Sequence, residues 1–249
     1  MKRRIKRYYY FALLFLFLPV LFLRAEPSKM FEFIFSVGHE GWIGDFTDYP
    51  VGDEAFYDLA WGWENLPVDI NDTDKKLSKG LFLSGNNHSD DLFMFVRRQI
   101  SGLESNTLYD LIFSIIIESN IPSGLFGIGG SPGESVYVKI GAASKEPKKI
   151  ELHGQYILSV DKGNQSEGGK NARVIGNLAN EEVLPQNPVY FPKHLVQKIP
   201  LQAKTDENGQ IWIFLGSDSG FEGPTKFYIA KVSVNAAKAS EDSLDLLRN

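Results

Sequence analysis

Short apolar segments separated by clusters of Gly, Asn, Asp and Pro recur along most of this sequence, and they constrain the fold more than any other feature. Several alternate apolar with polar residues, as strands buried on one face do. The predicted strands cover residues 31–37, 81–83, 92–96, 109–117, 135–140, 156–160, 210–215 and 226–234. Strands at this density predict an all-β fold, a sandwich or a barrel.

Helical periodicity is scarce. Residues 53–61 could form a short helix with Asp53 as its N-cap. Residues 178–200 contain four prolines and are expected to form a surface excursion with little regular structure. The sequence shows no internal repeat and no long linker, so we expect one β-domain over residues 26–235 and a flexible tail over residues 236–249.

The first 25 residues have the pattern of a secretory signal peptide. Five basic residues precede an apolar stretch over residues 8–23, and Arg24-Ala25 comes before a polar segment that contains Pro27. The 16-residue stretch is shorter than the roughly 20 residues of a membrane-spanning helix. We therefore predict a cleaved signal helix and a secreted or periplasmic protein without a membrane span, with an uncleaved membrane anchor as the alternative.

Charge and cysteine content exclude several classes of protein. Cleavage after Ala25 would remove six of the 26 basic residues and none of the 31 acidic ones, which takes the net charge from −5 to about −11. Nucleic-acid binding needs a basic face, and none is visible. The chain contains no Cys, so it has neither disulfide bonds nor the thiol that a bacterial lipoprotein needs. The sequence does not indicate an oligomeric state.

Four polar segments lie beside predicted strands, at residues 84–91, 129–134, 161–169 and 216–223. Their residue types are those of ordinary turns, and this structural reading stays open. Three of them are longer than a hairpin turn requires, however. The loops of a sandwich gather at its two ends, so these segments could meet at one site.

The loop chemistry suits two kinds of ligand. Carboxylate oxygens around a bend can bind Ca²⁺, and the candidate calcium ligands are Asp90, Asp91, Asp161 and Asp218. Amides and carboxylates also hydrogen-bond sugar hydroxyls, and Trp61 and Trp63 would lie on one side of an extended segment as an aromatic platform. The two tryptophans could equally cover the end of the sandwich. The candidate ligand-binding residues are Trp61, Trp63, Asn86, Asn87, His88, Glu134, Asn164 and Glu222.

Catalytic signatures are weaker. Asp218 occupies the position at which a nucleophile elbow carries Ser, and the four histidines lack the spacing of a zinc site. Glu134 and Glu222 could act as the two carboxylates of a glycosidase. An exported hydrolase that uses Glu134, Glu222, His88 or Asp90 is thus one alternative, and a structural or adhesive surface protein is another.

Three segments resemble carbohydrate-binding modules of the galactose-binding-like type. Residues 102–115, which include Tyr109-Asp110-Leu111-Ile112-Phe113, are similar to a core strand of these modules, and residues 227–234 are similar to their closing strand. Residues 31–33 and the Gly41-Trp42 turn are similar to their first strand. The sequence Gly-Asn-Asn-His-Ser-Asp-Asp at residues 85–91 also resembles a family of exported bacterial proteins without an assigned activity.

The resemblance implies an antiparallel jelly-roll β-sandwich. Together with the loop chemistry, it leads us to expect a non-catalytic protein that binds a glycan or another polar ligand, with calcium as a supporting ion.

Overall fold

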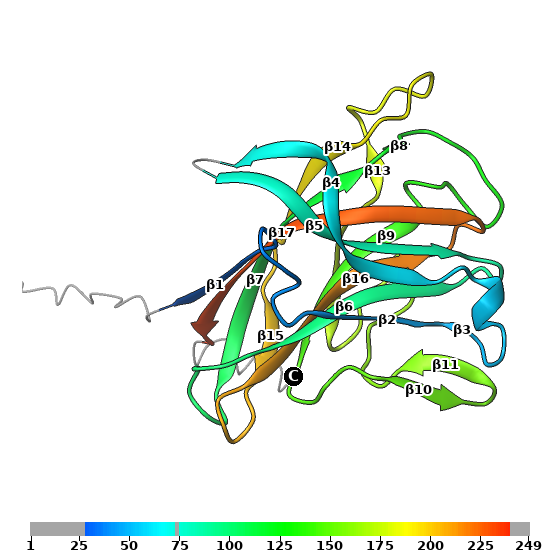
Figure 1. Ribbon diagram of the computed structural model, residues 1–249. Helices are drawn as coiled ribbons and strands as arrows, with labels where there is room; N and C mark the ends of the chain where they lie inside the picture. Colours follow the sequence, from blue (N-terminus) through cyan, green and yellow to red (C-terminus); the bar gives the residue numbers. More distant parts are fainter. Residues whose placement is uncertain (1–27, 73–74, 240–249) are drawn as a thin grey trace, which may run out of the picture.

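The computed structural model describes residues 28–72 and 75–239, which form a β-sandwich of two antiparallel sheets (Figure 1). We call the seven-stranded sheet sheet A and the five-stranded sheet sheet B. Sheet A contains β1 (Lys29–Ile34), β4 (Ala60–Asp72), β5 (Lys75–Asn86), β7 (Leu108–Ser119), β14 (Phe191–Val196), β15 (Leu201–Lys204) and β17 (Pro224–Lys238). Sheet B contains β2 (Ile43–Thr47), β6 (Leu92–Ile100), β9 (Val136–Ala143), β12 (Ala172–Asn177) and β16 (Ile211–Ser219).

Successive strands cross between the sheets, as in a jelly roll: β5, β7 and β17 of sheet A alternate along the chain with β6 and β16 of sheet B. The strand order is β14-β7-β17-β5-β4 in sheet A, where β1 also pairs with β17 and β15 with β7, and β12-β9-β16-β6-β2 in sheet B. Two small sheets complete the described part. One contains β3 (Tyr49–Pro50), β10 (Lys149–Leu152) and β11 (Gln155–Leu158), and the other pairs β8 (Ile121–Pro122) in parallel with β13 (Ala179–Asn180).

The main core lies between the two sheets. Phe113 of β7 and Leu83 of β5 belong to one buried cluster with Val138 of β9 and Leu215 of β16. Trp42 is fully buried in the same cluster and meets Phe33 edge to face, with ring centroids 5.4 Å apart. The burial of apolar surface is the main stabilising term in such a domain.

Sheet B is also covered on its outer face. Along β6, Leu92, Met94 and Val96 point into the main core, whereas Phe93 and Phe95 pack outside with Leu158 and Ala172. A segment that is apolar on both faces must be buried on both, which explains why this strand is continuously apolar. The segment 158–172 therefore forms a third layer over sheet B, and this layer positions the site described below.

Three expectations need correction. Residues 53–61 form only the 3₁₀ turn η1 (Glu54–Phe56), without a side-chain cap from Asp53, and β4 already begins at Ala60. Residues 178–200 include β14, which pairs with β7, so the excursion is partly ordered in sheet A. The last strand continues to Lys238, past the expected end of the domain at residue 235. The predicted signal helix and residues 240–249 lie outside the described residues.

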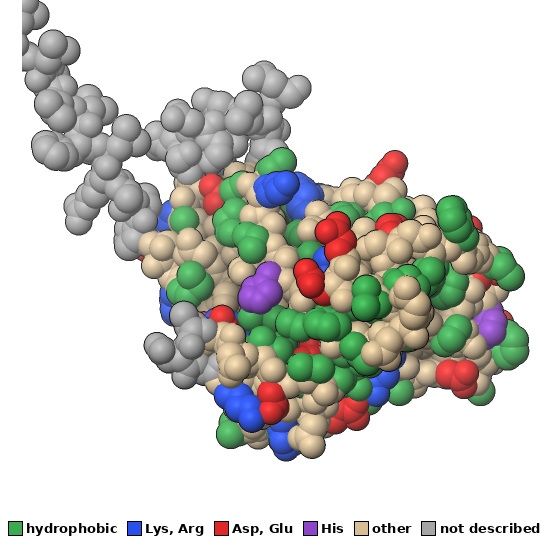
Figure 2. All heavy atoms as spheres, turned by 90° about the horizontal axis from the view of Figure 1, so that it is seen from above, with side chains coloured by type: hydrophobic (Ala, Val, Ile, Leu, Met, Phe, Trp, Pro, Cys, Tyr) green, Lys and Arg blue, Asp and Glu red, His purple; other side chains and the backbone are tan. Residues whose placement is uncertain are grey.

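Within residues 28–72 and 75–239, no helix has the length and apolar character needed to cross a membrane. Viewed from above the sandwich, acidic, basic and apolar side chains are interspersed on the surface (Figure 2).

Candidate ligand-binding site

The four polar segments meet at one end of the sandwich. Gln165 Nε2 donates a hydrogen bond to the carbonyl oxygen of Asp90 at 2.7 Å, which joins the third segment to the first. The amide of Gly220 donates to the carbonyl of Ser135, next to the second segment, at 2.9 Å. The amide of Glu222 likewise donates to the carbonyl of Ile128. These bonds agree with the expectation of one loop cluster, which we call the loop end.

Gly129 lies at the centre of the loop end. Its φ is +70°, a left-handed conformation that favours glycine. A Cβ on Gly129 would lie 2.2 Å from the carbonyl oxygen of Gly220, 3.1 Å from Oδ1 of Asp90 and 3.2 Å from Cγ of Glu222. The first and fourth segments therefore both come close to this one residue of the second segment, so three of the four segments meet here.

The first segment is fixed largely by Asn87. Its buried side-chain amide donates to the carbonyls of Ser219 and Phe221, each at 3.0 Å, and its Oδ1 accepts a bond from the amide of Ser89. Asn87 thus holds two turns together. Asn86, next to it, is paired with Pro224 in sheet A.

His88 is exposed at the same end and lies against the ring of Phe56, with centroids 4.1 Å apart.

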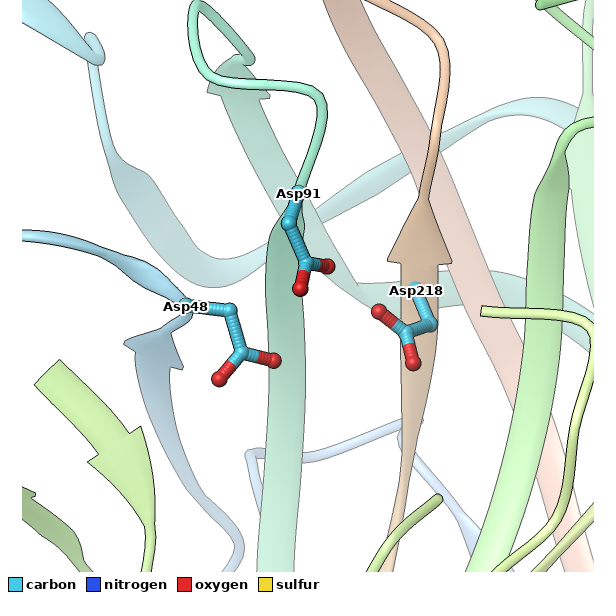
Figure 3. A group of neighbouring side chains, drawn as sticks. All are labelled: Asp48, Asp91 and Asp218. Atoms are coloured by element: carbon cyan, nitrogen blue, oxygen red, sulfur yellow. The ribbon is translucent and has the colours of Figure 1, made fainter. Parts of the chain in front are cut away.

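A buried charge network lies under the third segment, on the outer face of sheet B. Asp218 of β16 accepts bonds at Oδ2 from Lys139 of β9 at 2.6 Å and from Lys162 at 2.7 Å. Lys162 also pairs with Asp48 at 2.8 Å. The carboxylates of Asp48, Asp91 and Asp218 point toward one another (Figure 3), with oxygens that lie within 4.8 Å of one another. We call these five residues the charge network.

The protonation states in the charge network follow from burial and from its own charges. Burial, reinforced by the charges of Asp218 and Asp48, raises the pKa of Asp91 to about 8. Burial opposes the charge on Asp218, but Lys162 and Lys139 hold the pKa of Asp218 below its ordinary value. At neutral pH Asp91 is therefore a carboxylic acid that bonds to Asp218. The amino groups of Lys139 and Lys162 then face Asp218 and Asp48, although burial raises the pKa of Asp48 and lowers that of Lys139.

The charge network also fixes the third segment. Lys139 Nζ donates to the backbone carbonyls of Lys162 and Glu167 at 3.1 and 2.9 Å, and Gln165 N donates to Asp218 Oδ2 at 3.0 Å. Asp161 also helps to fix this segment, because its carboxylate accepts hydrogen bonds from the backbone amides of Gly163 and Lys170 at 3.0 and 2.8 Å. These two backbone bonds lower the pKa of Asp161.

A hollow of about 240 Å³ opens over the charge network. Its polar wall is formed by Asp48, Asp91, Asp161, Lys162 and Asn164, and its apolar wall by Ile157, Leu158 and Val160. Of the residues expected from the sequence to bind ligand or metal, Asp91, Asp161 and Asn164 line this hollow. Asp218 lies within the charge network behind it.

The remaining candidate acidic residues, Glu134, Asp90 and Glu222, do not line the hollow. Glu134 accepts bonds from the hydroxyl of Ser131 and, at 2.7 Å, from the amide of Gly124, so its carboxylate braces its own loop. Partial burial would raise the pKa of Glu134, but these bonds lower it. Asp90 is exposed and Glu222 is half-buried, and both lie beside Gly129.

Trp61 and Trp63 lie on one side of β4, as expected, but they pack against the main core at the β4 edge of the sandwich. Trp63 Nε1 donates to the carbonyl of Phe35 at 2.7 Å, and the ring of Trp61 packs over Gly44 of β2. The two rings thus cover the core at the β4 edge rather than at the end of the sandwich, and none of these contacts joins them to the loop end.

The expected calcium ligands do not form one open set of oxygens. Asp91 and Asp218 come together with Asp48, but Oδ2 of Asp218 already accepts bonds from two ammonium groups and an amide. Lys139 and Lys162 therefore already place positive charge beside Asp218 and Asp48. Sequence reasoning missed these two lysines and Asp48, because only the three-dimensional structure brings them together.

No protein-family model matches the sequence, and no curated protein matches it. Among solved structures, the chain is similar to the CBM22-1 xylan-binding domain of Xyn10C from Paenibacillus barcinonensis. The identity is 10%, the match covers 87% of this chain and 100% of that chain, and the TM-score is 0.40.

The chain is also similar to TmCBM27, a carbohydrate-binding module described in a study of mannan recognition. The identity is 13%, the coverage is 86% of this chain and 99% of that chain, and the TM-score is 0.39. A further similar structure is the cleaved adhesin domain of Lys-gingipain from Porphyromonas gingivalis, with 10% identity, 85% and 99% coverage and a TM-score of 0.38. Because these TM-scores are below 0.5, the likenesses neither place the chain in a family nor assign it a ligand.

Proposed function

We propose that this chain is an exported, non-catalytic binding protein for a glycan or another polar ligand, and that the hollow at the loop end is its binding site. The observation that carries the proposal is the fixed polar wall of the hollow, which the charge network and the backbone bonds of Asp161 hold in place. Preorganised groups lose little entropy when a ligand binds.

The lining of the hollow suits a polar ligand. The carboxylates of Asp48 and Asp161 can accept hydrogen bonds from hydroxyl groups, and the amide of Asn164 can donate and accept. Ile157 and Val160 add only a small apolar patch beside these polar groups. A hollow of about 240 Å³ is smaller than the roughly 300–1,000 Å³ of drug-sized ligand sites, so it suits one sugar residue or a chain end.

Asn164→Ala tests the proposal, because Asn164 is exposed at the hollow and its removal leaves the charge network intact. We expect a glycan array to identify a ligand, and Asn164→Ala to weaken its binding by roughly fivefold in calorimetry, since a net hydrogen bond contributes about 1 kcal/mol. The matched control is Asn208→Ala, an exposed asparagine in the turn before β16, which should bind as the unaltered protein does.

Calcium support forms part of the proposal and is tested by repeating the calorimetry with calcium chloride and with EDTA. If neither the array nor the calcium titration gave a signal with folded protein, the proposal would be abandoned.

A second candidate, hydrolysis, is favoured by one observation. Protonated Asp91 and the carboxylate of Asp48 line the same hollow, and they could act as an acid and a base. Turnover of chromogenic glycosides or esters that is lost in Asp91→Asn would support this candidate instead. An adhesive surface protein is expected to have a flat surface without pockets, and the hollow makes that alternative weaker.

A further inference from the structure

A second and larger cavity lies at one edge of the sandwich. It is lined by residues of β15 in sheet A and of β9 and β12 in sheet B. We call it the edge groove. Its volume is about 820 Å³, within the roughly 300–1,000 Å³ of ligand-binding sites. It shares no lining residue with the hollow at the loop end. The edge groove is therefore a cavity separate from the hollow.

The inner part of the edge groove is apolar. Its floor contains the buried side chains of Ala142 and Ala143 on β9 and Ala203 on β15, where larger residues would fill the space between the sheets. Leu108 and Ile199 extend the apolar surface outward, and Ile199 is 72% exposed. Apolar surface of this kind gains free energy when a ligand covers it, at about 25 cal/mol per Å².

The rim of the edge groove is basic. Lys170, Arg173 and Lys204 line it, and no ion pair joins any of them to another residue in the described ranges 28–72 and 75–239. Arg173 Nη1 is held in place by the carbonyls of Gly169 and Ala172.

The one acidic residue of the lining, Asp110, already accepts a hydrogen bond from Gln202 at 2.9 Å. Some other basic residues, such as Arg97, Lys226 and Lys231, are paired with carboxylates. In a chain with a net negative charge, three basic groups without such partners around an apolar floor are complementary to a ligand that carries a negative charge.

We propose that the edge groove binds an amphipathic organic anion, namely a long-chain carboxylate. Its alkyl chain lies on Ala142, Ala203 and Leu108, and its carboxylate meets the basic rim. Arg173 suits this role because a guanidinium group binds carboxylates in a planar, two-point geometry. Lys170 and Lys204 add positive charge on either side.

The experiment uses dodecanoate below its micellar concentration, titrated into the mature chain by calorimetry. We expect saturable binding with one ligand per chain, and at least tenfold weaker binding of dodecanol, which lacks the charge. The double variant Lys170→Gln/Lys204→Gln changes two exposed side chains and should also reduce the affinity for dodecanoate at least tenfold. The control Lys76→Gln removes an exposed lysine on β5, far along the chain from the edge groove, and should leave binding unchanged.

Three results would overturn the proposal: the absence of saturable binding, equal affinity for dodecanoate and dodecanol, or full affinity in the double variant. A fourth result would also overturn the proposal, namely binding that emerged only after deletion of residues 240–249. That result would assign the edge groove to this acidic, leucine-containing segment of the chain itself. The control for folding is the unfolding temperature of each variant.

Discussion

At the scale of single residues, the most informative position is Asp91, whose pKa of about 8 belongs to a carboxylic acid held in a buried charge network. The cost of burying a third negative charge beside Asp48 and Asp218 keeps the proton on Asp91. The folded protein therefore binds a proton that the unfolded chain releases near pH 4.

This linkage has a definite sign. Between about pH 4 and pH 8 the folded state binds more protons at Asp91 than the unfolded state does, so this residue makes the free energy of unfolding fall as the pH rises. Asp91→Asn removes the titrating group and keeps its shape. We expect the variant to lose less stability than the unaltered protein between pH 5 and pH 9, by about 4 kcal/mol, because the two states differ by one bound proton over about three pH units.

Urea unfolding at a series of pH values measures this difference. Glu118, whose pKa burial raises to about 7, contributes a slope of the same sign in both proteins, so the comparison isolates Asp91. Identical pH slopes for the two proteins would contradict the assignment.

The same scale shows why the charge network could be predicted only in part. The sequence indicates Asp91 and Asp218 as candidate calcium ligands because they lie in polar segments. Lys139 lies in a strand of alternating residues, between the buried Val138 and Ile140, at a position that a two-layer sandwich would expose. It is buried because the third layer covers sheet B. The apolar run of β6 is consistent with such a layer, but the alternating strand that contains Lys139 does not indicate it.

At the scale of elements, the strands that the sequence predicted are those with strong apolar patterns. Residues 109–117 lie within β7, and residues 92–96 lie within β6. The strands that were missed include β2, β12, β14 and β15, which lie at sheet edges or pair along part of one neighbour. Such strands are half exposed and have mixed polarity, so their pairing depends on distant residues rather than on their own sequence.

Gly129, at the centre of the loop end, allows the fixed geometry of the polar segments to be tested. In Gly129→Ala the new Cβ would lie 2.2 Å from the carbonyl oxygen of Gly220, in addition to the strain of a φ of +70°. Gly124→Ala is a matched control, because Gly124 has a φ of +79° and no atom within 4 Å of the added Cβ.

We expect Gly129→Ala to be the less stable of the two by roughly 1–3 kcal/mol, since it alone combines strain with a steric clash. Thermal unfolding of both variants measures the difference. Equal loss in the two would show that the loop segments move apart without cost, and the fixed geometry assigned to the loop end would then be wrong.

At the scale of the whole molecule, all described strands begin after the first 25 residues. Its first strand, β1, begins at Lys29 and pairs with β17, and its buried residues reach from Phe33 to Ala236. Cleavage after Ala25 would therefore leave every described strand intact.

We accordingly expect a chain expressed with its full sequence to be recovered outside the cytoplasm with Glu26 as its first residue and with the circular dichroism of a β-protein. Measurement of the intact mass of the recovered protein shows whether the first 25 residues have been removed. Recovery of uncleaved chain from the membrane fraction would favour the anchor instead.

One detail of the charge network bears on how such a domain could change during evolution. Lys139 holds the third layer through the backbone carbonyls of Lys162 and Glu167, and not through the side chain of Glu167. The exposed side chains of Asn164, Ser166 and Glu167 can therefore be exchanged without touching the buried charges that fix the loop. The positions that fix this loop are thus separate from the side chains that it exposes, and a library randomised at these three positions is expected to retain the scaffold.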